Sequence, residues 1–320
     1  MQTLLAIIIL LVLGAPVFAQ SPATYQIRST PETVNWGYYD ASVKPVVTMK
    51  SGDILEFDTT QRPPNTDAAW QKVPRGPGAH VLVGPVAIIG AEPGDVLEVK
   101  ILDVQLAAET ANNGFRPEYG TLPDDFPYAV SGAIQLDRKR NIGVFKPGIE
   151  IPLRPFLGSI GVAPPPSLGR ISSRPPGYHT GNIDNKELIA GTTLLMPVHT
   201  QGALLSLGDG HAGQGDGEVD GSAMETALSG KLQITVRKGK RLKWPRIETP
   251  THYIVMGLHP DLDEAMRIAV RETIDFLVEE KGLTRDEAYR LASVAVDFRV
   301  TQSVDVTKGI HAMIAKSLFK

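Results

Sequence analysis

GDGHAGQGDGE, residues 208–218, holds five glycines and four ionisable side chains within eleven residues. Because glycine permits positive φ and close approach of backbones, this composition predicts a tight loop and not an ordinary helix or strand. The loop presents Asp209, His211, Asp216 and Glu218. Carboxylates with an imidazole suit a divalent cation, and a zinc ion with an open coordination position can activate water. The alternative interpretation is a solvated glycine turn between two strands.

Four other segments accompany this loop along the chain. They are GAEPGDVLEV at 90–99, YHTGNIDN at 178–185, ELIAGTTLLMP at 187–197 and DVTKGIHAMI at 305–314. Together with residues 208–218 they resemble the acetamidase/formamidase family, over roughly residues 30–318. The resemblance implies β-sandwich and barrel-like parts with an inserted or appended α/β piece, and hydrolysis of a small linear amide.

Composition narrows the class of protein. The chain has 320 residues, 42% of them hydrophobic and 21% charged, which is typical of a globular protein with two or three subdomains. The formal charge of −3 gives no electrostatic reason to expect a nucleic-acid or anionic-lipid partner. The absence of cysteine excludes disulfides, thiolate zinc ligands and a cysteine nucleophile.

The N-terminus predicts export. Residues 4–17 form an almost unbroken apolar run that is too short for a comfortable membrane span, and Val17 and Ala19 fit a signal-peptidase site. We therefore expect residues 1–19 to be a signal peptide, a secreted or periplasmic mature chain, and no stable membrane partner after cleavage. An uncleaved anchor is the alternative, because no Lys or Arg precedes the run.

The patterning predicts a mainly β fold with a sandwich or barrel-like body at residues 20–245 and a small α/β element at 246–320. Short alternating runs broken by glycine and proline indicate strands, including a hairpin across residues 46–57. The Pro- and Gly-rich stretch 112–176 predicts long loops that cover the sheets. Helical spacing from Pro260 to Gly282, and a Thr284–Glu287 capping box, predict two helices ahead of a final strand.

Three residues are candidate metal ligands. His211 ranks first because the glycines beside it leave its imidazole free to turn inward, and Asp184 follows in a loop that also offers Asn182. His80 is the third, since it matches a variable His/Asn position of the family. The alternatives are a turn-capping role for Asp184 and a hydrogen-bonded loop histidine at position 80. We expect zinc as the metal, with calcium as the other choice.

Hydrolysis of an amide also needs a proton carrier, because the leaving amine must be protonated. Glu218 and Glu92 are the candidates, although Glu92 also reads as an ordinary exposed turn carboxylate. Asp209 and Asp216 are interpreted either as ligands or as side chains that hold the loop through backbone N–H groups. Glu225 is expected to support the ligands from outside the metal's own shell.

These observations predict an exported, metal-dependent amidohydrolase that cleaves the C–N bond of a formamide- or acetamide-like substrate to give carboxylate and ammonia. A homo-oligomer is expected. Two other classes stay open on the sequence: a noncatalytic exported β-protein with a structural calcium site, and a glycosidase that uses Glu92 and Glu218 as paired carboxylates.

Overall fold

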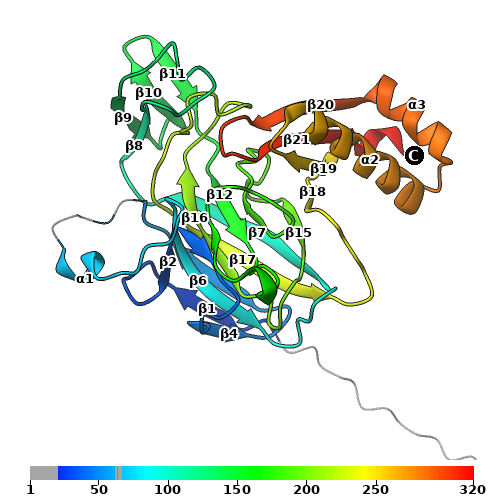
Figure 1. The fold of residues 1–320 in the computed structure, drawn as a ribbon, viewed down its shortest axis with the longest axis horizontal. Coiled ribbons are helices and arrows are strands. Elements are labelled where there is room, and N and C mark those ends of the chain that lie inside the picture. Colours follow the sequence, from blue (N-terminus) through cyan, green and yellow to red (C-terminus); the bar gives the residue numbers. More distant parts are fainter. Residues whose placement is uncertain (1–20, 62, 64–66) are drawn as a thin grey trace, which may run out of the picture.

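The computed structural model describes residues 21–61, 63 and 67–320 and is built mainly of β-strands (Figure 1). The predicted signal peptide, residues 1–19, lies outside the described residues. In the described part of the chain, no helix combines the length and apolar character that crossing a membrane requires. The predicted mainly β fold with a C-terminal α/β element is confirmed.

The largest sheet has nine strands and runs from the body of the molecule into its C-terminal part. Its pairs are antiparallel except β1 with β5. In spatial order the strands are β1 (Thr24–Ile27), β5 (Ile54–Asp58), β17 (Leu228–Arg237), β7 (Val96–Leu106), β15 (Thr193–Pro197), β18 (Arg246–Glu248), β19 (His252–His259), β21 (Lys308–Ala315) and β20 (Val296–Gln302). The boundary predicted at residue 245 falls directly before β18. Strands from both sides of this boundary belong to the same sheet.

A second sheet of six strands packs against the body part of the first. Its strands are β14 (Thr180–Asn182), β12 (Phe156–Gly161), β16 (Leu205–His211), β6 (Val81–Ile88) and β2 (Val34–Trp36), with β4 (Val47–Met49) also paired to β6. One buried apolar cluster holds side chains of both sheets, such as Leu97 and Ile234 with Val83 and Leu207. Because burial of apolar area is the main favourable term in folding, this shared layer holds the two sheets together as a sandwich.

The glycine-rich segment is not a loop along its whole length, so that prediction is wrong for its first half. Residues 208–211 belong to strand β16. A Cβ at Gly208 would lie 2.3 Å from the carbonyl oxygen of Val81, and one at Gly210 would lie 2.5 Å from that of Thr226. These glycines therefore allow neighbouring backbones to approach closely, and the chain turns only after His211.

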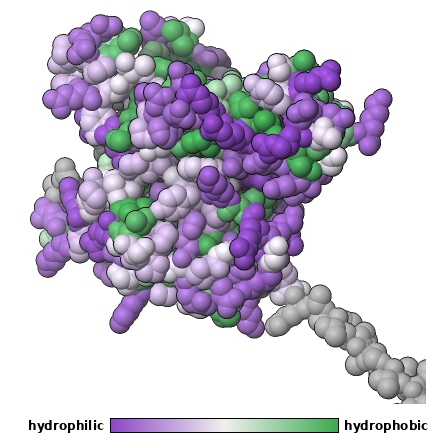
Figure 2. Space-filling model, turned by 45° about the vertical axis from the view of Figure 1, so that its right-hand side comes forward, coloured by the Kyte–Doolittle hydropathy of each residue, from purple (hydrophilic) through white to green (hydrophobic). Residues whose placement is uncertain are grey.

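The region predicted as covering loops contains a sheet of its own, which corrects that expectation. Four antiparallel strands, drawn at the upper left of Figure 1, follow one another in the order β11 (Ile149–Pro152), β10 (Ile142–Lys146), β9 (Val130–Asp137) and β8 (Thr110–Phe115). A small cluster that includes Ala111, Ile134 and Leu136 stabilises it. Much of its surface stays exposed, with Phe145 at 50%, and Figure 2 shows apolar residues at the top of the molecule among hydrophilic ones.

The hairpin expected across residues 46–57 is also wrong. Strand β4 pairs in parallel with β6 of the second sheet, whereas β5 pairs with β1 and β17 of the first. The Gly52 turn is present at φ +95°, but it carries the chain from one layer of the sandwich to the other. A short connection between two alternating runs does not by itself determine which sheet each strand joins.

The two predicted helices are confirmed with their ends. Helix α2 (Leu262–Lys281) begins after Asp261, whose carboxylate accepts from the Glu264 N–H at 2.9 Å, and ends at Gly282 with φ +69°. Helix α3 (Arg285–Ala295) carries the Thr284–Glu287 capping box. Both cover the part of the large sheet formed by β19, β21 and β20, over a buried cluster of their own. The predicted final strand is β20, and β21 follows it as a further strand that the sequence reading omitted.

The remaining elements are short. They are the strand pair β3 (Tyr38–Tyr39) and β13 (Ile171–Ser172), the helical turn α1 (Ala68–Gln71), and the 3-10 turns η1 (Pro166–Leu168) and η2 (Lys316–Leu318).

His311 in β21 provides a test of the buried C-terminal core. Its side chain is fully buried, its Nδ1 lies 2.8 Å from the Thr301 hydroxyl, and burial lowers the pKa of the imidazole to about 4. The unfolded chain takes up a proton near the ordinary pKa of 6.5, which the folded chain does not, so stability is lost as the pH falls through this window. We expect acidification from pH 7 to pH 5 to cost the wild type about 2 kcal/mol more than it costs His311→Gln. Denaturant unfolding of both proteins at both pH values measures this, and equal losses would contradict it.

Candidate metal and active site

The site is organised around the imidazole of His211, at the end of β16. The side chain is 1% exposed, and neither ring nitrogen has a hydrogen-bond partner among the described residues. Its Nε2 lies 3.4 Å from Glu225 Oε1 and 3.6 Å from Asp209 Oδ2, and its Nδ1 lies 4.0 Å from Asp184 Oδ1. The Phe156 ring meets the imidazole edge-on, with centroids 5.0 Å apart, and limits its rotation. One histidine therefore faces carboxylates on both sides.

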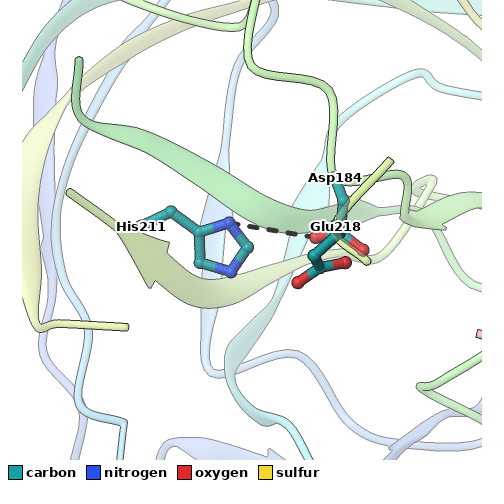
Figure 3. Close-up of side chains that lie close together, drawn as sticks. All are labelled: Asp184, His211 and Glu218. Carbon is teal, nitrogen blue, oxygen red and sulfur yellow. Dashed lines mark ion pairs between the residues drawn. The ribbon is translucent and has the colours of Figure 1, made fainter. Parts of the chain in front are cut away.

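The Nδ1 side of His211 is closed. Figure 3 shows Asp184 and Glu218 pointing toward each other beside the imidazole, and both are buried. Burial raises the pKa of both carboxyls well above the usual range, and the neighbouring charge of Asp305 raises them further. The Asn182 amide donates to Asp184 Oδ2 at 2.8 Å and to Asp305 Oδ2 at 3.0 Å, which holds these two carboxylates together.

The Nε2 side of His211 is built by Asp209, Glu225 and His80. His80 Nε2 lies 3.8 Å from Asp209 Oδ2, while its Nδ1 is within hydrogen-bond distance of the Ser173 carbonyl oxygen, at 3.1 Å. Donation of Nδ1–H to that carbonyl leaves the Nε2 lone pair directed at the site. Ser159 adds a hydroxyl 3.4 Å from Asp209 Oδ2.

The charges on this side shift one another's pKa values. Burial opposes the charged forms of Asp209 and His211. The pKa of Asp209 nevertheless lies below its usual value because His80 and His211 outweigh burial, and Glu225 and Asp209 raise the pKa of His211 to about 10. The pKa of Glu225 is raised by burial.

Backbone geometry brings these side chains together. Asp184, Asp209 and Glu218 all have positive φ, at 46°, 56° and 44°, a region that residues other than glycine rarely adopt. Such strained positions cluster at functional sites. Gly158 on β12 leaves the space that the side chains share: a Cβ there would lie 2.5 Å from His211 Cε1, 2.6 Å from Asp184 Oδ1 and 2.8 Å from Asp209 Oδ2.

A cavity of about 420 Å³ opens onto the Nε2 side. Its wall includes His80, Asp209, Glu225 and Asp305, together with residues of β8 and β9. The described residues of its wall do not include Asp184, His211 or Glu218, whose side chains are almost wholly buried. A small molecule in this cavity therefore meets the Nε2 side of the centre.

The donor set fits a divalent cation. Asp209, His211 and Glu225 offer ligand atoms within 4.8 Å of one another, and so do Asp184, His211 and Glu218. Both imidazole nitrogens of His211 and Asp184 Oδ1 are buried without a hydrogen bond, a costly arrangement that a bound cation would relieve. An imidazole with carboxylate oxygens is a donor set that zinc accepts.

The structure brings together most of the residues expected from the sequence and leaves two outside. His211, Asp184, His80, Asn182, Asp209, Glu218 and Glu225 all lie in the cluster. Glu92 is exposed and pairs with Lys238 at 2.8 Å, and Asp216 pairs with Lys186 at 2.9 Å. Neither of the two is placed with His211.

Two residues of the site were missed on the sequence. Asp305 joins the cluster from the loop between β20 and β21, where Arg174 Nε lies 3.3 Å from its Oδ1. The available signal was its position at the start of the family-like segment 305–314. Gly158 carried no such signal, because a glycine that leaves room for a ligand looks the same in sequence as any other glycine in a strand.

Comparison with known proteins gives a consistent result. Residues 38–174 and 169–320 match the model of the acetamidase/formamidase family. A formamidase of Methylophilus methylotrophus is 30% identical over 191 residues, which cover 44% of this chain and 47% of that protein. The crystal structure of a predicted acetamidase/formamidase from Thermoanaerobacter tengcongensis has a TM-score of 0.83 at 28% identity and covers 93% of this chain and 97% of that one. An acetamidase of Bacillus halodurans has a TM-score of 0.82 at 29% identity, with 92% and 98% covered.

The fold and the site define a β-sandwich protein with a cavity-facing imidazole–carboxylate centre. The chain belongs to the acetamidase/formamidase family. It spans about half the length of the curated relatives that it matches, with 47% of the Methylophilus protein and 49% of an acetamidase of Mycolicibacterium smegmatis covered.

Gly158→Ala should weaken cation binding, because the new methyl group would occupy the space between His211, Asp184 and Asp209. Displacing ligands or their supports typically costs 10–100-fold in metal affinity, so we expect a loss of about that size for zinc. Competition with a chromophoric chelator measures it. Gly215→Ala is the matched control, because its Cβ would meet no atom within 4 Å. Equal zinc affinity in the two variants would contradict this assignment of the space.

Proposed function

We propose that the protein is an exported, metal-dependent amidohydrolase that cleaves the C–N bond of a linear amide and releases carboxylate and ammonia. Membership of the acetamidase/formamidase family and the 30% identity to a protein named formamidase support the reaction class. The observation that carries the proposal is the convergence of His80, Asp209 and Glu225, which line a cavity large enough for a substrate, with the buried imidazole of His211.

The proposed metal position is the Nε2 side of His211. His211 Nε2 and an Asp209 oxygen, which belong to a group with ligand atoms within 4.8 Å of one another, would hold the ion there. His80 Nε2, 3.8 Å from Asp209 Oδ2, would complete the set. A bound metal supplies Lewis-acid polarisation of the amide carbonyl and lowers the pKa of water. Zinc is the proposed ion because two imidazoles favour it, whereas calcium prefers sets of oxygen ligands.

Asp184 is proposed as the residue that orients His211. Its Oδ1 is 4.0 Å from Nδ1, on the side away from the proposed ion. Ligating histidines commonly present their second nitrogen to a carboxylate, which fixes both the tautomer and the ring orientation. Asn182 and Glu218, buried beside Asp184, would then support the centre from the side away from the cavity.

Glu225 is proposed as the proton carrier in place of Glu218. Glu225 lines the cavity, whereas the described wall residues do not include Glu218. The Gln61 amide and the Ala223 N–H, the latter at 2.9 Å, donate to its carboxylate and fix its direction. Burial raises the pKa of Glu225, which suits a group that accepts a proton from water and passes it to the leaving nitrogen.

Two further parts of the proposal rest on the sequence. Export rests on residues 1–19, and N-terminal sequencing of exported protein should find Gln20 first if the segment is cleaved. Homo-oligomer formation is proposed from the family resemblance. The noncatalytic alternative, a structural calcium site, fits less well because such sites are closed, whereas the Nε2 side of this one faces a cavity.

Removal of the metal should abolish ammonia release from short amides, and added zinc should restore it. The physical reason is that the proposed ion would polarise the amide carbonyl and lower the pKa of the attacking water, and the chain has no cysteine that could attack instead. The measurement is ammonia release from formamide and acetamide by protein that has been treated with a chelator, dialysed and then reconstituted. Full activity in protein shown by elemental analysis to lack metal would remove the metal from the proposal.

Glu225→Gln should lower kcat by about 10²–10⁴-fold, since the amide keeps the size and hydrogen-bonding reach of the carboxylate but cannot take a proton from water. Zinc content should stay near wild type. Glu92→Gln is the matched control, since that side chain is exposed and paired with Lys238, and it should keep wild-type kcat. A comparable fall in Glu218→Gln with near-normal turnover in Glu225→Gln would return the proton-carrying role to Glu218.

A further inference from the structure

The cavity is much larger than the smallest amides require. Its volume is about 420 Å³, within the 300–1,000 Å³ range typical of sites for larger ligands. An amide of three or four heavy atoms needs the room of about two water molecules, on the order of 60 Å³. Most of the cavity therefore lies beyond the space that such an amide would fill next to His80, Asp209 and Glu225.

The part of the cavity wall away from His80, Asp209 and Glu225 combines apolar side chains with the guanidinium group of Arg116. Phe115 and Val130, from β8 and β9, form an apolar stretch of the wall. Arg116 follows directly, and its guanidinium carbon lies 3.4 Å from the centroid of the Tyr119 ring. Arg174 contacts the same ring at 4.1 Å. Stacking on an aromatic ring restricts a long side chain that would otherwise be free.

Arg116 differs from the other cationic groups of the wall, Arg174 and His80, in having no counter-ion among the described residues. Arg174 pairs with Asp305 at 3.3 Å and donates to the Val304 carbonyl oxygen at 3.0 Å. Asp220 accepts from the Asn113 side chain at 3.1 Å and from the Ser222 N–H at 3.0 Å. Within the described part of the chain, no carboxylate lies in ion-pair range of Arg116.

The spacing along β8 places this cation at a reachable distance from the proposed reaction centre. The Asn112 N–H donates to the Glu225 carbonyl oxygen, and the Glu225 N–H to that of Asn112, both at 2.8 Å. Arg116 is four residues further along the chain. An extended backbone rises about 3.3 Å per residue, so the backbones of Asn112 and Arg116 lie at most about 13 Å apart.

We propose that the preferred substrate is an amide whose acyl part ends in a carboxylate: a monoamide of a dicarboxylic acid. The inference rests on the proposed amide hydrolysis and names its substrate class. Arg116 receives the distant carboxylate in its planar fork, and Phe115 and Val130 contact the connecting carbon chain. In the reaction, the oxygen of water bonds to the amide carbon, the C–N bond breaks, and a proton passes to the nitrogen. The second proton of water ionises from the new carboxyl group and is taken up by ammonia, so the products are a dicarboxylate and ammonium.

The test compares kcat/KM along the series from succinamate to suberamate with uncharged alkyl amides of equal length. For at least one chain length, the metal-loaded wild type should prefer the carboxylate-bearing amide by about 10–100-fold, the size of a charge-assisted interaction. Arg116→Gln should lose this preference. Arg75→Gln is the matched control, because Arg75 also stacks on an aromatic ring, Trp36 at 4.0 Å, but is not part of the cavity wall, and it should keep the preference.

The outcomes distinguish failure of the proposed substrate class from failure of the proposed amidase function. Hydrolysis of uncharged amides with no preference for the carboxylate at any length, or a preference that survives Arg116→Gln, would overturn the substrate class and leave the amidase function standing. A preference for amides that end in an ammonium group would also overturn it and would transfer recognition to Asp220. Failure of the metal-loaded protein to hydrolyse any amide would overturn both.

Discussion

The burial of one imidazole among carboxylates is the constraint on which the rest of the site depends. His211 is 1% exposed and has acidic oxygens within 4.0 Å of both ring nitrogens. Burying charge without full pairing is costly, and here the acidic groups outnumber the cationic ones. A divalent cation at this point would add positive charge among these carboxylates. Burial and the charge of Asp209 raise the pKa of Glu225, whereas the charges of His80 and His211 outweigh burial and lower that of Asp209.

The architecture serves this centre by bringing distant segments together. Strand β16 supplies Asp209 and His211, the segment after β14 supplies Asp184, and the loop between β20 and β21 supplies Asp305. The last of these comes from the part of the chain that also carries α2 and α3. Because β18 extends the body's sheet into β19 and β21, the C-terminal element is held in register with the site and is not a loosely attached domain. The four-stranded sheet adds a further part of the cavity wall through β8 and β9.

Sequence signals gave correct predictions where the interactions that determine an element join residues close together in the chain. Asp261, Gly282 and the Thr284–Glu287 box determine the helix ends through hydrogen bonds within a few residues, and both helices could be read from the sequence. The hydrophobic pattern failed to predict strands whose neighbouring segments are distant in sequence. Residues 208–211 read as a loop because the glycines that make room for Val81 and Thr226 look the same as turn glycines. Strands β8 to β11 were hidden because few of their residues are buried, so the sequence shows little of the alternation that marks a strand packed on a core.

The same distinction holds for the site. The polar residues of the glycine-rich segment and of residues 178–185 could be named in advance, since dense ionisable side chains are visible in any sequence. Which nitrogen of His211 faces the cavity could not, because that depends on the packing of Phe156, Glu225 and β8 around it. Glu92 was a candidate proton carrier on the sequence, together with Glu218, and the fold places it next to Lys238.

Anomalous X-ray diffraction at the zinc absorption edge, from crystals of the mature protein supplied with zinc, tests the central claim most directly. The account predicts one strong peak on the cavity side of His211, with His80 Nε2 and His211 Nε2 about 2.0–2.1 Å away and an Asp209 oxygen about 2.0–2.2 Å away. A peak between His211 Nδ1, Asp184 and Glu218, or no peak at His211, would contradict it.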